Sequence, residues 1–194
     1  MVEVRYRQIA VLTACETAAA RAYGAESGLF HLAVQADHSM VLGNFQPYQE
    51  FLQTGKLIAL TRATELRYEL TADAKLYSGH GNGIGAFGGL GHSEDRHFKE
   101  MTWRYRGFTS TTSCKSKAVD FVRTRAKTEL DTPVLLEFQI PAGFRLLPMA
   151  ALGADMTHES EFLIPLGLPF LISAASRVTV EDVQDVLHLV LVPK

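Results

Sequence analysis

The chain has 194 residues, of which 47% are hydrophobic and 21% are charged, and its formal net charge is -2. These values are ordinary for a single soluble globular domain. The small negative charge excludes a protein that binds nucleic acid or an anionic membrane through a general basic field. Two cysteines, Cys15 and Cys114, are too few for a disulfide framework, so both are expected to be reduced. No segment approaches the roughly 20 apolar residues of a transmembrane helix.

The first 70 residues carry the spacing of helices. Apolar residues recur at helical intervals over residues 6–24, where Gly24 is expected to end the helix. Ser27 is expected to cap a short second helix, and a third helical stretch is expected over residues 48–66, with a break near Gly55.

The N-terminal segment also has a faint likeness to a signal peptide. Arg5 and Arg7 precede a short apolar run at residues 9–14, but Glu16 follows and the run is too short for the apolar region of a signal peptide. We interpret the run as part of the first amphipathic helix, with no signal peptide in this chain.

From about residue 71 the pattern changes to strands. A glycine-rich loop is expected over residues 79–91, and helices are expected over residues 93–103 and 116–127. Strands are expected at residues 76–77, 108–112, 134–140, 162–164, 170–173, 177–180 and 186–192. The sequence therefore predicts an α+β fold in one domain, residues 1–194, with an N-terminal helical lobe (1–70) and a β-rich core (71–194).

Two further patterns have the outward form of ligand sites. Gly83-x-Gly85-x-x-Gly88 has the form of a dinucleotide-binding fingerprint, but the βαβ context and the later acidic residue that it requires are missing. We interpret this loop as one that leaves room for a ligand or a partner. The seven histidines show no zinc-binding spacing, so no metal site is expected.

The acidic pair Glu159 and Glu161 precedes an apolar segment. Residues i and i+2 of an extended segment point to the same side, so both carboxylates are expected to face one cleft. Close like charges raise the pKa of one carboxyl group, which suits proton abstraction. The alternative is an exposed loop that carries two acidic residues before a strand.

Three motifs in order resemble those of the mono-ADP-ribosyltransferase family. They are Ser110-Thr-Thr112, the strand and turn at residues 135–143, and Glu159-Ser-Glu161-Phe-Leu-Ile-Pro165. The first resembles the Ser-Thr-Ser motif of the family and the last resembles the Glu-x-Glu motif of its arginine-specific branch, the R-S-E class. The likeness covers about residues 70–194, and the helical start suits bacterial toxin-like members. The resemblance implies an ADP-ribosyltransferase-like core of two β-sheets with the NAD cleft between them.

The resemblance also implies a reaction. NAD is the substrate, and loss of nicotinamide leaves an oxocarbenium-like ribosyl cation that Glu161 stabilises. Ser110 orients Glu161, and Glu159 helps to deprotonate the guanidinium of the acceptor, which otherwise keeps its proton at neutral pH. The enzyme is formally a glycosyltransferase, and its expected partner is a host protein that presents an arginine. Such a protein is a bacterial effector and virulence factor that acts in the host cytosol, for example after type III secretion.

One element of the family pattern differs. The first strand of the family reads roughly Tyr-Arg-Gly, and its arginine binds the phosphates of NAD, whereas this chain has Tyr77-Ser78-Gly79. Serine supplies neither a charge nor a bidentate donor. Arg106, on the same strand face as Ser110, is one candidate for the cation that replaces it.

The serine at position 78 leaves more than one interpretation of the site open. His80 is a second candidate for contacting NAD, in a cofactor site that also includes Tyr77, Ser78, Gly79, Thr111 and Thr112. Alternatively, NAD binding is lost, and the chain is a pseudo-enzyme that binds an arginine-containing peptide through its acidic cleft. A third activity, NAD hydrolysis, uses the same site with water as the acceptor.

Overall fold

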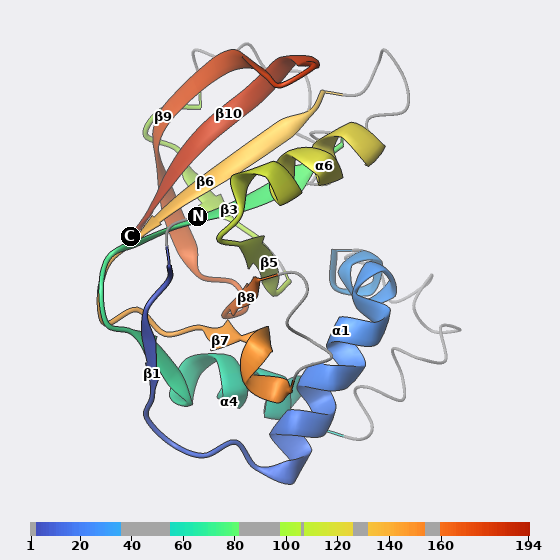
Figure 1. Cartoon of the computed structure of the whole chain (residues 1–194), viewed down its shortest axis with the longest axis vertical. Coiled ribbons are helices and arrows are strands. Elements are labelled where there is room, and N and C mark those ends of the chain that lie inside the picture. The colour runs from blue at the N-terminus through green and yellow to red at the C-terminus, as the bar shows by residue number, and fades with distance from the viewer. Residues whose placement is uncertain (1–2, 36–54, 82–97, 106, 126–131, 154–159) are drawn as a thin grey trace.

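The computed structural model describes residues 3–35, 55–81, 98–105, 107–125, 132–153 and 160–194, without the side chains of 25–35 and 125. After one short N-terminal strand, helices come first and strands dominate the rest, which confirms the α+β prediction (Figure 1). In chain order the elements are β1 (Tyr6–Gln8), α1 (Ala14–Gln35), α4 (Lys56–Leu66), β2 (Tyr68–Leu70), β3 (Ala74–His80), β4 (Thr102–Arg104), β5 (Thr109–Thr112), α6 (Lys115–Arg125), β6 (Val134–Ile140), β7 (Leu147–Pro148), the 3-10 helix η2 (Met149–Leu152), β8 (Glu161–Ile164), β9 (Pro169–Val180) and β10 (Val183–Pro193).

Eight of the described strands form one mixed sheet in the order β4-β9-β10-β6-β3-β5-β8-β7. Strands β10 and β6 are parallel, and the other neighbours are antiparallel. Strands β3 and β5 are joined through one residue pair, Tyr77 with Thr112. This single pair links a larger part of the sheet that ends at β3 to a smaller part that begins at β5, so one eight-stranded sheet stands where the sequence predicted two (Figure 1).

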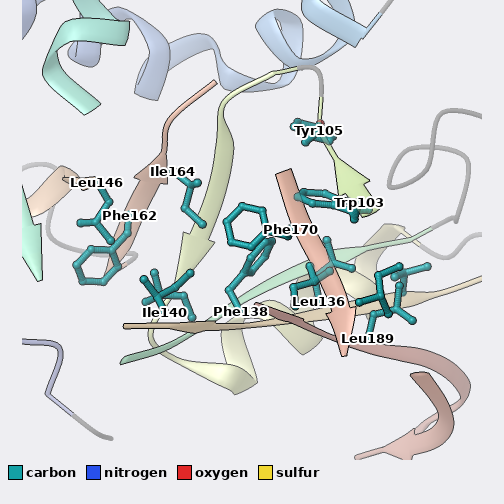
Figure 2. Close-up of a cluster of buried hydrophobic side chains, with 14 of the residues drawn as sticks. Trp103, Tyr105, Leu136, Phe138, Ile140, Leu146, Phe162, Ile164, Phe170 and Leu189 are labelled. Carbon is teal, nitrogen blue, oxygen red and sulfur yellow. The ribbon is translucent and has the colours of Figure 1, made fainter. Parts of the chain in front are cut away.

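The main apolar core lies between these two parts of the sheet. Phe138 of β6 meets Phe170 of β9 edge to face, with ring centroids 5.1 Å apart. Phe162 and Ile164 of β8 belong to the same buried cluster, as Figure 2 shows. Because alternate residues of a strand face one side, β6 places Leu136, Phe138 and Ile140 in this core together.

A second apolar cluster packs helices α1 and α4 against the smaller part of the sheet. Its buried members include Ala19 and Tyr23 of α1, Leu60 of α4 and Leu163 of β8. Because Phe108, the residue before β5, belongs to the same cluster, helix α1 packs against β8 and against the chain that enters β5.

Helix α1 differs from the prediction at both ends. Its start is set by a capping box, in which the Thr13 N–H donates to Glu16 Oε2 (2.8 Å) and the Glu16 N–H donates to Thr13 Oγ1 (3.2 Å). Residues 6–8 form β1 and pair with β2, so the helical interpretation is wrong for residues 6–13. The helix also runs through Gly24 and Ser27 to Gln35, so Gly24 does not end it and Ser27 caps no separate helix; one interior glycine costs a helix only about 1 kcal/mol.

Three predictions in the β-rich part also need correction. Residues 102–104 form β4 and pair with β9, although the sequence predicted a helix over residues 93–103. Residues 170–173 and 177–180, predicted as two strands, belong to the single strand β9, because β10 pairs with it along most of its length. Strand β3 continues through Gly79 to His80, where the sequence predicted a loop.

Several other elements agree with the sequence, whereas β2, β7 and η2 were not predicted. Strand 134–140 is confirmed as β6, and the helices predicted over 48–66 and 116–127 are confirmed over their described parts as α4 and α6. Cys15 and Cys114 are both free thiols. No helix within the described ranges is long and apolar enough to cross a membrane. The predictions for Gly83, Gly85 and Gly88 lie outside the described residues.

We expect Glu16→Gln to destabilise the fold by about 1–2 kcal/mol, because the variant weakens both the helix cap and a charged hydrogen-bond pair. Glu16 is 2% exposed. It accepts hydrogen bonds from Arg67 Nε (2.9 Å) and Nη2 (2.7 Å). The expected loss allows for solvent screening at Arg67. Denaturant unfolding at pH 7 measures it.

The pH dependence provides the control. Burial opposes ionisation of Glu16, but hydrogen bonds from Arg67 and Thr13 outweigh this effect and lower its pKa. Because the pKa is lowered on folding, the stabilisation is present above the unfolded-state pKa and is lost as pH falls through the folded-state pKa. The gap between wild type and Glu16→Gln should therefore close in acid. A gap that stays constant into strong acid would contradict the assignment.

Candidate functional site

Strands β5 and β8 bring Ser110 and Glu161 together. The two strands are antiparallel, with Thr112 opposite Glu161 and Ser110 opposite Leu163. Across this register the Ser110 hydroxyl donates a hydrogen bond to Glu161 Oε1. Both side chains are half-buried. The structure thus places in direct contact two residues that the sequence grouped as catalytic, although they are far apart in the chain.

The two threonines after Ser110 bond to backbone groups. Thr111 is 2% exposed, and its hydroxyl donates to the Phe162 carbonyl of β8 (2.8 Å). The Thr112 hydroxyl accepts from the Cys114 N–H (3.1 Å), where the chain turns into α6. These contacts tie β5 to β8 and to α6, so both threonines hold the strand that carries Ser110. Their predicted contact with a cofactor stays a prediction.

The link between the two acidic residues is not extended. Ser160 has a φ of 47°, in the left-handed region. The expectation that Glu159 and Glu161 point to the same side assumed an extended chain, so that argument is wrong at Ser160. Glu159 itself lies outside the described residues, and its role stays a prediction.

The residues predicted on β3 divide between its two faces. Ser78 Oγ lies 3.3 Å from His80 Nε2. The two side chains can meet because residues i and i+2 of a strand point to the same face. The His80 ring lies against Tyr105, with centroids 6.5 Å apart. Tyr77 and Gly79 belong to the opposite face, where α6 packs: a Cβ on Gly79 would lie 1.9 Å from the Ala118 carbonyl oxygen.

Two tyrosines that no sequence pattern singled out lie beside these residues. Tyr23 of α1 is 2% exposed, and its pKa is raised by burial first, then by the charge of Glu161 and by Tyr105. Tyr105 is thus near Tyr23, and its ring also lies against the ring of His80. The available signal was weak: Tyr23 follows Ala19 by one helical turn on the apolar face. Arg106, the neighbour of Tyr105 in sequence, lies outside the described residues.

A second polar cluster lies elsewhere on the sheet. Glu137 of β6 pairs with Lys75 (3.1 Å), and His188 Nε2 lies 3.4 Å from its carboxylate, although burial lowers the pKa of His188. Burial opposes ionisation of Glu137, but hydrogen bonds from Lys75 and Gln139 lower its pKa. A cavity of about 1040 Å³ opens nearby and is lined by Lys75, Tyr77, Gln139, Cys114 and Lys115, among others, but not by Ser110 or Glu161. This cavity is therefore not the candidate site.

The described parts of the chain contain no group of three or more His, Cys, Asp or Glu side chains that could hold a metal ion. No protein-family model matches the sequence. No curated protein matches it either.

The arrangement of strands and helices is the ADP-ribosyltransferase fold, as the sequence predicted. Plx2a, an ADP-ribosyltransferase toxin from Paenibacillus larvae, has a TM-score of 0.71 and 16% identity, over 94% of this chain and 87% of its own. Vis from Vibrio splendidus, in complex with agmatine, has a TM-score of 0.64 and 16% identity, over 96% of this chain and 77% of its own. The Clostridium limosum C3 exoenzyme has a TM-score of 0.61 and 13% identity, over 94% of this chain and 86% of its own. At these identities the likeness establishes a shared fold.

Proposed function

We propose that this chain is a mono-ADP-ribosyltransferase that transfers ADP-ribose from NAD to an arginine of a host protein. The hydrogen bond from Ser110 to Glu161 carries the proposal. It joins adjacent strands of an ADP-ribosyltransferase fold, and it places a carboxylate with a fixed orientation on the smaller part of the sheet.

The chemistry follows from that carboxylate. Departure of nicotinamide leaves positive charge on the ribose, and a carboxylate held in place stabilises this charge without having to reorganise. Ser110 donates to Oε1 of Glu161 and so fixes the plane of the carboxylate. In the proposed reaction Glu161 accepts a hydrogen bond from a ribose hydroxyl and stabilises the ribosyl cation. Glu159 assists deprotonation of the arginine that attacks it.

Two observations support arginine as the acceptor. The chain has the Glu159-x-Glu161 pattern, which matches the arginine-specific branch of the family. In addition, Vis has been solved in complex with agmatine, a small molecule that carries the same guanidinium group as arginine. A carboxylate beside a guanidinium forms a strong charged pair, and it positions the group for attack.

We assign NAD binding to the β3 strand and its neighbours. Ser78 and His80 form a half-buried polar pair next to Tyr105, and we propose that this pair, with Arg106, replaces the family arginine at the phosphates. Tyr77 and Gly79 contribute by holding β3 against α6. Thr111 and Thr112 contribute by fixing β5.

Calorimetric titration with NAD tests this assignment. We expect wild type to bind NAD with a Kd in the micromolar range, about -8 kcal/mol, and Ser78→Arg to change this Kd by less than about threefold. The gain is small because the phosphate contact is already made by other groups. Ser176→Arg, which adds the same charge at an exposed position of β9, is the matched control.

The opposite result favours a second candidate. The serine at position 78 removes a charge-assisted contact that typically contributes about 1.5–3 kcal/mol. If wild type does not bind NAD and Ser78→Arg restores binding, the chain is a pseudo-enzyme. In that case it should bind an arginine-containing peptide without NAD in the same calorimeter. If wild type binds NAD but releases free ADP-ribose with no protein acceptor, the activity is NAD hydrolysis.

The host-directed role is part of the same proposal. Plx2a is described as a toxin and has the same fold, which supports an enzyme that acts on proteins of another organism. We propose that the chain works as a bacterial effector in the host cytosol, with type III secretion as one route.

A further inference from the structure

Helix α1 contacts the backbone near both of the strands that carry Ser110 and Glu161: it bonds to Phe108, just before β5, and to Leu152, in the segment that leads toward β8. Arg21 Nη2 donates to the carbonyl of Leu152, at the end of η2, over 2.7 Å. Two residues later in the chain, the Tyr23 hydroxyl lies 3.4 Å from the Phe108 carbonyl and donates to it. Phe108 directly precedes β5, and Leu152 lies in the segment that leads toward β8. One turn of α1 therefore holds backbone on both sides of the site.

Tyr23 is packed as well as hydrogen-bonded. Its ring meets the Phe108 ring edge to face, with centroids 5.8 Å apart, and the whole residue is 2% exposed. A buried phenol needs a hydrogen-bond acceptor, and the Phe108 carbonyl provides one. Ring and hydroxyl together fix the point where the chain enters β5.

The charge state of Tyr23 suits a donor role. Burial raises the pKa of Tyr23 well above its ordinary value, and the nearby Glu161 carboxylate raises it further. The phenol is therefore neutral at physiological pH and keeps its proton beside the carboxylate. A neutral donor in this place can hold the strand without adding a second negative charge next to Glu161.

We propose that Tyr23 is a positioning residue for Glu161: it fixes Phe108 at the start of β5, and so fixes the Ser110 hydroxyl that binds the carboxylate. The inference rests on the proposed function for its catalytic meaning. Ser110 is the second residue of β5 and lies two residues after Phe108, so a shift at Phe108 reaches the Ser110–Glu161 hydrogen bond through only one intervening residue. Reactive geometry is sensitive to shifts of about 1 Å.

The first test compares Tyr23→Phe with Tyr68→Phe. Both tyrosines are buried in the same apolar cluster, and both changes remove one hydroxyl. We expect Tyr23→Phe to lower kcat for ADP-ribose transfer by about tenfold with the KM for NAD unchanged, because an interaction that serves the transition state is lost. Tyr68→Phe should leave kcat unchanged. Equal effects of the two variants would overturn the proposal.

A double-mutant cycle tests the route through Ser110. If Tyr23 acts through the Ser110 hydroxyl, Tyr23→Phe should cost less than about twofold in kcat when Ser110→Ala is already present. A loss in the double mutant equal to the product of the two single losses would show that Tyr23 acts independently of Ser110, and would overturn the proposal.

A third measurement does not depend on turnover. The ¹³C signal of the Glu161 carboxyl group, assigned with Glu161→Gln, reports its surroundings in the protein without NAD. We expect this signal to shift in Tyr23→Phe and to stay in place in Tyr68→Phe. An unmoved signal in Tyr23→Phe overturns the positioning role. Absence of transferase activity in wild type would overturn the proposed function instead, so the two failures are distinguishable.

Discussion

Glu161→Gln is expected to lower the rate of ADP-ribose transfer by about 1000-fold or more, which corresponds to about 4 kcal/mol of transition-state stabilisation. The substitution keeps the size of the side chain and its ability to accept the Ser110 hydrogen bond, but it removes the negative charge. Because the proposed transition state carries positive charge on the ribose, the charge of Glu161 is the property that the reaction needs.

The measurement is the initial rate of transfer from NAD to a protein or small guanidinium acceptor, with the unfolding midpoint of each variant recorded alongside. Glu161 lies at the start of β8 and is half-buried, so its loss of charge should leave the fold intact. Glu137→Gln is the matched control, since Glu137 is a carboxylate of the same sheet that is 7% exposed and paired with Lys75. That variant should lose stability and keep its activity while folded. Transfer by Glu161→Gln within about tenfold of wild type would refute the assigned role.

Gly79→Ala should destabilise the protein by about 3 kcal/mol, at the upper end of what overpacking a core costs. A Cβ at this position would lie 1.9 Å from the Ala118 carbonyl oxygen and 3.0 Å from Val122 Cγ2, both in α6. The first of these atoms is backbone, so no side-chain rotation relieves the contact. Helix α6 and strand β3 would have to move apart along their whole interface.

The control for Gly79→Ala is Gly55→Ala. Gly55 has a φ of 68° and open space where a Cβ would lie, so alanine there meets only the backbone cost of about 1–2 kcal/mol. Gly79 shows the opposite case, because close packing and not a left-handed φ requires glycine there. Denaturant unfolding of the two variants separates these causes. A smaller loss for Gly79→Ala than for Gly55→Ala would show that α6 can yield at this contact.

The consequence of Gly79 extends to the site. Ser78 and His80 flank this glycine on β3, and their mutual contact of 3.3 Å depends on the position of the strand. Close packing of α6 therefore sets where the proposed NAD-binding pair lies. The close contact with α6 requires glycine at position 79, and this requirement does not depend on which residue occupies position 78.

Several elements could be predicted from the sequence because their causes are local. The segment 134–140, which is apolar except for Glu137 and Gln139, ends at Pro141, and it forms β6 with the predicted bounds. The helical spacing after Cys114 predicts α6 to within a residue at its start. The start of α1 is also encoded locally, since Thr13-x-x-Glu16 has the form of a capping box, but the apolar run before it has helical spacing without being helix.

The order of motifs along the chain was enough to predict the ADP-ribosyltransferase fold and to group Ser110 with Glu161. It was not enough to find Tyr23, because a tyrosine on the apolar face of a helix looks like any other core residue until its neighbours are known. Likewise, the division of the β3 residues between two faces depends on where α6 packs, and the φ of Ser160 depends on how the chain enters β8.

The sequence by itself thus determined the elements with strong local periodicity and the set of residues with the required chemistry. The tertiary structure decided which of those residues meet. Strand pairing between β5 and β8, and the packing of α1 on β8 and on Phe108 just before β5, bring together groups from three distant parts of the chain. Such contacts follow from burial and sheet register over the whole molecule, which the local periodicity of the sequence does not specify.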